Sequence, residues 1–265
     1  MAAGQTTGVG SGVRADPVVI RKCATLDEMR ACVALQQKVW NFSERDLIPL
    51  RIFAIAEKIG GQAIGAFQGD DLIGFALAIP GSRNRHSYLH SQMLAVREDS
   101  RNAGLGRRLK LFQREEAISR GFDLMEWTFD PLEIKNAYLN IEGLGAIARR
   151  YNLDQYGVTS STLQGGLPTD RLVAEWWLKS DRVRQLLNAG QLPPAKIESN
   201  IPVPAEVYTW KAAAETRGRA MAVQNQNREL FINAFKRGLA VIGYERDPHG
   251  NGKFLLGRWQ EPLSL

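Results

Sequence analysis

Residues 94–109 read Leu94-Ala-Val-Arg-Glu-Asp-Ser-Arg101-Asn-Ala-Gly104-Leu-Gly106-Arg-Arg-Leu109. This pattern predicts a hydrophobic strand that passes through a glycine-rich loop into a helix. The two glycines let the backbone approach an anion without a Cβ in the way, and the N–H groups at a helix start present partial positive charge to it. Four basic side chains are expected around the same turn: Arg101, Arg107, Arg108 and Lys110. The expected ligand of the loop is therefore polyanionic.

Two common phosphate loops do not fit this spacing. A P-loop requires Gly-x4-Gly-Lys-Ser/Thr, whereas Gly106 is followed by two arginines and no hydroxyl. A dinucleotide fingerprint requires Gly-x-Gly-x-x-Gly, whereas residue 109 is Leu. The pattern that remains is Arg-x-x-Gly-x-Gly, with a strand ending at Val96 before it and an apolar helix face after it.

This motif and its offset from the strand resemble the acetyl-coenzyme A (acetyl-CoA) pyrophosphate loop of the GNAT superfamily of N-acetyltransferases. The resemblance extends over about residues 18–160, because the predicted elements follow the order that the superfamily uses. Thr25 with Glu28 predicts a helix start, and Gly121 predicts a helix end. Strands are expected at 17–24, 62–68, 72–79, 88–96 and 124–129, and helices at 25–40, 49–59 and 105–120. The resemblance implies an α/β (α+β) fold whose mixed, mostly antiparallel sheet is flanked by helices.

The chain divides into three expected parts. Residues 1–16 are expected to be a disordered tail, residues 17–162 a GNAT-like acetyl-CoA-binding domain, and residues 166–265 a C-terminal α/β half. No second Arg-x-x-Gly-x-Gly occurs in that half, so it is either a degenerate repeat or an elaboration that completes the first sheet. Its expected strands are 172–178, 197–203, 239–244 and 253–259, and its expected helices are 181–188 and 219–237.

Composition and charge limit the class of protein. With 265 residues, 44% of them hydrophobic, the chain can bury a full core. No apolar run is long enough for a membrane helix or a signal peptide, so no membrane partner is expected. Two cysteines are typical of reduced thiols in a cytoplasmic protein, and three scattered histidines indicate no metal site. The net charge is +6, and six basic residues fall in the loop and its helix, where a phosphate-bearing coenzyme explains them better than nucleic acid does.

The resemblance also assigns contacts to acetyl-CoA, the expected co-substrate. Backbone groups of Leu94 and Val96 would pair with the pantetheine arm, and an amide near them would polarise the thioester carbonyl. Asn136 matches the asparagine that binds this arm in the family, with Asn140 one turn later as the alternative. Arg101, Arg107 or Arg108 could reach the remaining phosphates. The amides expected to hold the pyrophosphate belong to Asn102, Ala103, Gly104, Leu105, Gly106 and Arg107.

The catalytic residues are less clearly marked. A lysine-like amine with a pKa of about 10.4 must first lose a proton, which costs roughly 4.6 kcal/mol at pH 7 and requires a base. Glu126 and His90 are the candidates, although residues of this kind are more often surface or hydrogen-bonded structural residues. The tyrosine that protonates the leaving thiolate in the family would fall on Gly143, which leaves Tyr138 as the candidate acid and Tyr151 as the other nearby hydroxyl. A thiolate with a pKa near 8.5 needs little help from an acid.

Three functions remain open. We expect an enzyme, a monomer or homodimer, that acetylates a small-molecule or peptide amine from acetyl-CoA. The second is a tandem-GNAT-like transferase that moves an aminoacyl group from tRNA, which predicts a basic groove between the two halves. The third is a non-catalytic acyl-CoA sensor, which the missing tyrosine favours. The sequence does not specify the acceptor.

Overall fold

The computed structural model describes residues 16–157, 159–161 and 164–259. Within them the backbone forms one ten-stranded sheet with the order β1-β2-β3-β4-β5-β7-β6-β9-β10-β8. Its strand pairs are antiparallel except for β4 with β5. The predicted mixed α/β fold with a mostly antiparallel sheet is confirmed. The tail predicted at residues 1–16 lies outside the described residues except for Asp16.

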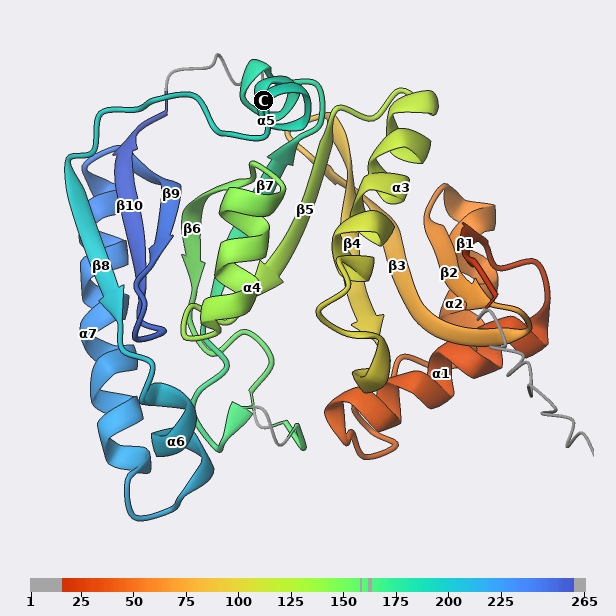
Figure 1. Ribbon diagram of the computed structural model, residues 1–265, viewed down its shortest axis with the longest axis horizontal. Helices are drawn as coiled ribbons and strands as arrows, with labels where there is room; N and C mark the ends of the chain where they lie inside the picture. The colour runs from red at the N-terminus through yellow and green to blue at the C-terminus, as the bar shows by residue number, and fades with distance from the viewer. Residues whose placement is uncertain (1–15, 158, 162–163, 260–265) are drawn as a thin grey trace, which may run out of the picture.

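The first part of the chain supplies half of the sheet and three main helices (Figure 1). Its strands are β1 (Val18–Lys22), β2 (Gln62–Gln68), β3 (Asp71–Arg83), β4 (His86–Val96) and β5 (Leu124–Phe129). Its helices are α1 (Leu26–Trp40), α2 (Leu50–Ala56) and α3 (Leu105–Ser119), with short 3-10 turns at Glu57–Ile59 and Glu98–Ser100. The α1 and α2 side chains pack on one face of β2 and β3, whereas Leu105 and Leu109 of α3 pack on the other face.

The rest of the chain extends the same sheet. Its strands are β6 (Ile147–Asn152), β7 (Arg171–Trp177), β8 (Ser199–Val203), β9 (Leu239–Arg246) and β10 (Gly252–Arg258). Its helices are α4 (Ile134–Tyr138), which continues as a π-helical turn at Leu139–Gly143, then α5 (Asp181–Ala189), α6 (Val207–Ala212) and α7 (Arg217–Lys236). Ile134 of α4 and Phe231 of α7 belong to the same hydrophobic cluster. No helix in the described part of the chain combines the length and apolarity needed to cross a bilayer.

Strand β6 and helix α6 were not predicted. In β6, Ala148 and Tyr151 pair with Ala174 and Leu172 of β7, so two residues of β6 stand opposite one residue of β7. This bulge breaks the alternation by which a strand is identified from sequence, and it brings two consecutive arginines to the sheet. Helix α6 has only six residues and no side-chain N-cap hydrogen bond, so it carries no start signal.

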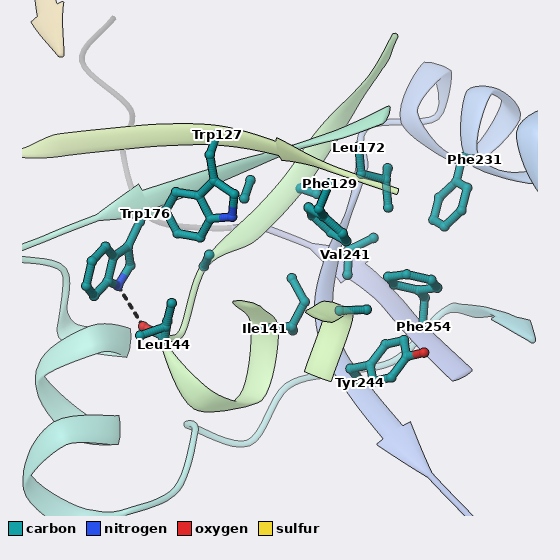
Figure 2. Close-up of a cluster of buried hydrophobic side chains, with 14 of the residues drawn as sticks. Trp127, Phe129, Ile141, Leu144, Leu172, Trp176, Phe231, Val241, Tyr244 and Phe254 are labelled. Carbon is teal, nitrogen blue, oxygen red and sulfur yellow. Dashed lines mark hydrogen bonds between the residues drawn. The ribbon is translucent and has the colours of Figure 1, made fainter. Parts of the chain in front are cut away.

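The largest hydrophobic cluster joins both parts of the chain (Figure 2). Trp176 of β7 is fully buried, and its indole Nε1 donates to the carbonyl of Leu144 at 2.7 Å. Its ring meets Trp127 of β5 edge-on, with centroids 5.9 Å apart. Phe231 of α7 and Phe254 of β10 belong to the same cluster. The shared sheet and core favour the elaboration over the degenerate repeat as the account of the C-terminal half.

A capping box begins α1, as predicted. The amide of Glu28 donates to Thr25 Oγ1 at 3.2 Å, and the Glu28 carboxylate accepts from the amides of Ala24 (2.6 Å) and Thr25 (3.4 Å). Arg21 also donates two hydrogen bonds to this carboxylate. The Arg21 hydrogen bonds, together with the two amides, lower the pKa of Glu28 to about 2.

We therefore expect Glu28 to contribute to acid sensitivity. Because its pKa is lower in the folded than in the unfolded chain, its stabilisation is complete above the unfolded value of about 4.3 and is lost as pH falls through about 2. Urea unfolding of the native protein and of Glu28→Gln between about pH 6 and pH 2 measures this contribution. The native protein should lose more stability over this range than the variant, and parallel curves would contradict the assignment.

Candidate active site

Strands β4 and β5 separate shortly after they meet. They pair at only two positions, Leu89 with Met125 and His90 with Glu126. Two residues beyond His90, Gln92 bulges out of register with β3, and bulges bend and twist a strand. In the described residues the backbone of 91–96 consequently has no ladder partner on β5. This separation is the feature that the resemblance predicted for the pantetheine arm.

A cleft of about 530 Å³ occupies this separation. Its walls include Trp127, whose ring contacts Lys110 of α3, and Thr128, whose hydroxyl lies 2.8 Å from that of Tyr156. Trp127 and Thr128 are consecutive residues of β5, so their side chains point to opposite faces of the sheet. A cleft that is lined by both side chains therefore opens on both faces. The α3 and α4 side contributes Lys110, Asn136 and Asn140, and the opposite side contributes Trp40, Phe42, Asp46, Tyr156 and Arg171 among others.

Two loops meet over the opposite side of this cleft. The carboxylate of Asp46, between α1 and α2, accepts hydrogen bonds from the amide (2.7 Å) and hydroxyl (2.5 Å) of Ser160. The amide of Ser43 donates to the same hydroxyl oxygen at 2.8 Å. These contacts join the α1–α2 loop to the loop between β6 and β7, so both loops form one rim.

The glycine-rich loop lies where β4 leads into α3. Asn102 and Gly104 take left-handed conformations, with φ of +63° and +74°. The first α3 amide that donates to a backbone carbonyl is that of Arg108, which reaches Gly104 at 3.0 Å. Within the described chain, no backbone carbonyl accepts from the amides of residues 102–107. Unpaired amides at a helix N-terminus are suited to an anion, as the sequence predicted.

Three of the four predicted basic side chains brace this loop. Arg101 Nε donates to the Val96 carbonyl at 3.1 Å, and Arg108 Nη2 donates to the Val18 carbonyl at 3.1 Å. Arg107 Nε donates to the Gly143 carbonyl at 2.9 Å and so ties α3 to the π-helical turn. The expected place of Lys110 near the phosphates is wrong, because this side chain lies on the helix face that packs on β4 and β5 and is only 2% exposed.

The two asparagines named for the pantetheine arm both line the cleft. Asn136 is exposed, whereas Asn140 is buried, and its side-chain Nδ2 has no hydrogen-bond partner in the described structure. A buried amide without a partner costs roughly 1–3 kcal/mol, so Asn140 is suited to a ligand carbonyl. Leu94 also lines the cleft, whereas Val96 lies beyond its wall at the end of β4.

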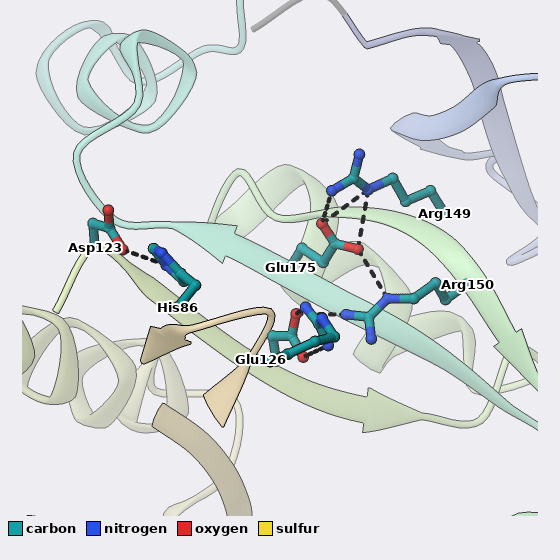
Figure 3. A network of polar contacts seen from close by, with 7 residues as sticks. His86, Asp123, Glu126, Arg149, Arg150 and Glu175 are labelled. Atoms are coloured by element: carbon teal, nitrogen blue, oxygen red, sulfur yellow. Dashed lines mark hydrogen bonds and ion pairs between the residues drawn. The ribbon is translucent and has the colours of Figure 1, made fainter. Parts of the chain in front are cut away.

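Glu126 is held in a network of buried carboxylates and arginines (Figure 3). Its carboxylate, 2% exposed, binds Arg83 through two hydrogen bonds (3.1 and 2.5 Å) and Arg150 through one (2.5 Å). Glu175 stands directly opposite on β7 and is bound by Arg149 and Arg150. Glu126 is not part of the cleft wall. Two guanidinium groups already occupy the oxygens of this carboxylate, so this environment argues for a structural role.

The other catalytic candidates are also placed outside the wall. His90 lies beside the closed end of the cleft. Burial is the main cause that lowers its pKa, so the imidazole stays neutral near pH 7. Tyr138 is 43% exposed beneath Arg246. The hydroxyl of Tyr151 is engaged by Asp170 at 2.8 Å. Tyr156, which the sequence did not single out, is the tyrosine in the wall; it lies in a loop with no periodicity to mark it.

Comparison with known proteins agrees with this geometry. Residues 28–136 match the model of the acetyltransferase (GNAT) family. A GNAT-family protein from Desulfovibrio desulfuricans superposes with a TM-score of 0.50 at 14% identity, over 61% of this chain and 99% of its own. The protein yncA from Salmonella typhimurium, solved with acetyl-CoA, gives 0.50 at 17% identity, over 62% and 96%. No curated protein sequence matches this chain.

The fold and the divided strands define a protein with an acetyltransferase-type α/β sheet. Residues 28–136 of this chain match the GNAT acetyltransferase family model, and the fold agrees with that of GNAT structures, as the resemblance predicted. The two structural neighbours share the fold at low identity and leave 39% and 38% of this chain without a counterpart in them.

Proposed function

We propose that this protein transfers an acetyl group from acetyl-CoA to the amine of a small molecule or peptide. The observation that carries the proposal is the separation of β4 from β5 directly before a loop whose amides at 102–107 are unpaired. A strand with free backbone groups suits the amide-containing pantetheine arm, and unpaired amides suit the pyrophosphate. The match to the GNAT family model and the acetyl-CoA bound to yncA support this assignment.

The residues present fit the coenzyme. Backbone groups of Leu94 and Val96 would pair with the arm, and the unpartnered Nδ2 of Asn140 would donate to one of its carbonyls. The amides of residues 102–107 would hold the pyrophosphate, and Arg101 and Arg108, both exposed, are near enough in sequence to supply further charge. The GNAT-like domain would span residues 17–162, and the C-terminal half would complete its sheet.

The acceptor would approach from the face opposite α3. Trp40 and Phe42 stack there with ring centroids 5.6 Å apart, and Tyr156 lies beside the guanidinium of Arg171. Aromatic faces attract ammonium groups, which is the form in which a free amine arrives at neutral pH. The cleft thus offers the coenzyme one side and the acceptor the other.

The two alternative functions are less well supported. A coenzyme sensor requires no passage to the second face of the sheet, whereas the cleft is lined by residues of both faces. The tRNA-dependent transferase predicted a basic groove between two halves. In the described residues the strands of both halves instead share one hydrogen-bonded sheet.

Acetyl-CoA should stabilise the folded protein. At about 100 times its dissociation constant, a ligand raises the unfolding free energy by roughly 2.7 kcal/mol. A thermal-shift titration measures this effect, and ATP at equal concentration is the control because it has phosphates but no pantetheine arm. Release of free thiol from acetyl-CoA in the presence of a panel of primary amines then distinguishes turnover from binding alone. No shift with acetyl-CoA, or an equal shift with ATP, would contradict the proposal.

A further inference from the structure

Lys110 is a buried amine in the wall of the cleft. Its side chain is 2% exposed and reaches from α3 to the start of the separation between β4 and β5. Nζ lies 2.8 Å from Ser91 Oγ, 3.7 Å from Met125 Sδ and 3.7 Å from the ring centroid of Trp127. The sequence predicted this side chain near the phosphates, whereas the structure buries it in the cleft wall.

Lys110 has no carboxylate partner within ion-pair distance among the described residues, and this distinguishes it from Lys211. Lys211 is also buried, but its Nζ lies 2.7 Å from Glu133 and 3.3 Å from Asp130. Burial lowers the pKa of Lys211, yet those two carboxylates outweigh it and raise the pKa overall. For Lys110 burial acts unopposed and places the pKa well below its ordinary value. The same fold thus contains one buried lysine that stays charged and one that is disposed to be neutral.

The groups around Lys110 do not reverse this effect. Ser91 and His90 of β4, Met125 and Trp127 of β5, and Trp176 of β7 are neutral or disposed to be neutral, since burial lowers the pKa of His90. Gln113 on the same helix is neutral as well. The faces of the two indole rings favour an ammonium, but less than burial disfavours it.

Hydrogen bonding leaves the lone pair of the Lys110 amine free. The hydroxyl of Ser91 donates its proton to Gln113 Oε1 at 3.1 Å, so its oxygen can only accept from Lys110 Nζ. A neutral amine that donates to Ser91 keeps an unshared pair with which to take up a proton. Ser91 therefore orients Lys110 as a proton acceptor.

Lys110 also lies at the closed end of the cleft. Ser91 is the first β4 residue after the last pair with β5, and the bulge at Gln92 follows it. An arm that enters between the strands from the glycine-rich loop must end here, because the strands are joined beyond this point. The amine is thus placed where the reacting end of the arm would stop.

We propose that Lys110 is the proton acceptor of the acetyl transfer, an inference that rests on the proposed function. The first proton of the acceptor's ammonium moves to Lys110 Nζ, and the freed nitrogen pair forms the new N–C bond to the acetyl carbon. The C–S bond breaks with its electron pair on sulfur, and sulfur takes the proton from Lys110. The second proton that the nitrogen loses on becoming an amide goes to solvent. Lys110 thereby also replaces the acid that Gly143 cannot supply.

The charge state of Lys110 can be measured without turnover. In the unfolded chain Lys110 binds a proton up to a pKa of about 10.4, whereas in the fold it stays neutral, so stability should rise with pH below that value. We compare the unfolding equilibrium constant of the native protein with that of Lys110→Met at each pH. Between the pKa of Lys110 in the folded protein and about 10.4, this ratio should fall by up to about tenfold per pH unit. Lys179→Met, at an exposed lysine, is the matched control and should track the native protein. Parallel curves for the native protein and Lys110→Met would overturn the proposal.

Turnover supplies the second readout. Thiol release from acetyl-CoA with the panel of primary amines should fall about 100-fold in kcat for Lys110→Met, and Lys110→Arg should not restore it because a guanidinium accepts no proton. Both variants should retain the thermal shift with acetyl-CoA. Undiminished kcat in Lys110→Met would overturn the proposal. Absence of any acetyl-CoA shift in the native protein would instead overturn the proposed function, while the unfolding curves still report on Lys110.

Discussion

The Gly106→Glu variant should bind acetyl-CoA at least about 100-fold more weakly than the native protein, while remaining folded. A hundredfold loss corresponds to roughly 2.7 kcal/mol, and like charges brought together at a binding surface cost several kcal/mol. The new carboxylate would stand beside the unpaired amides of residues 102–107, where the pyrophosphate is expected. A negative charge in the first turn of a helix favours the helix itself, so the variant should not lose stability.

Gly106→Ala is the matched control for this experiment. A Cβ at Gly106 would meet Leu94 Cδ2 at 3.8 Å and Val96 Cγ2 at 4.0 Å, which are ordinary contacts. Gly106 does not have a positive φ, so alanine causes no backbone strain there. The alanine variant should therefore remain folded and keep most of its affinity. Calorimetric titration with acetyl-CoA compares the three proteins, and equal affinity in the glutamate variant would contradict the assignment of the loop.

Signals between neighbouring residues predicted much of the fold. The strand expected at 124–129 has those bounds as β5, and Gly121 and Gly238 take left-handed conformations after α3 and α7. The capping box of Thr25 and the hairpin of β2 and β3 are also confirmed. Each of these features depends on residues that are close in the sequence. The glycine-rich loop belongs to the same class, because its conformation is determined within a few residues.

The cleft depends on contacts between distant residues, and its lining was predicted less well. Lys110 was expected beside the glycine-rich turn, as one of the cations around the phosphates. It nevertheless lies with Gln113 and Ala117 on the buried face of α3, at helical spacing, and that spacing is a signal from which its burial could have been predicted. Tyr156 carries no comparable signal, since its loop reaches the cleft only through tertiary packing.

Glu126 illustrates the same limit. The strand that contains Glu126 was predicted correctly, but the residues around its carboxylate come from β3, β6 and β7. Arg149 and Arg150 both reach Glu175 because the β6 bulge places two consecutive residues opposite one residue of β7. No local pattern in the sequence indicates that bulge.

The Glu126→Ala variant should lose about 3 kcal/mol of unfolding free energy and keep its affinity for acetyl-CoA. Removing one partner of a buried ion pair costs roughly 3–5 kcal/mol because the other charge is left without compensation. The cost should fall at the lower end, since the Arg83 and Arg150 side chains are 30% and 36% exposed and can turn toward water. Urea unfolding at neutral pH measures the loss.

Two further variants separate a structural from a catalytic role for Glu126. Glu115→Ala removes a carboxylate that is 69% exposed and paired with Arg114, and it should cost less than about 1 kcal/mol. Glu126→Gln keeps the side-chain shape without the charge, so its loss of stability should lie between that of Glu115→Ala and that of Glu126→Ala. A base would behave in the opposite way: its replacement by glutamine would stop turnover and spare stability. Full stability combined with lost turnover in Glu126→Gln would therefore restore Glu126 as the proton acceptor in place of Lys110.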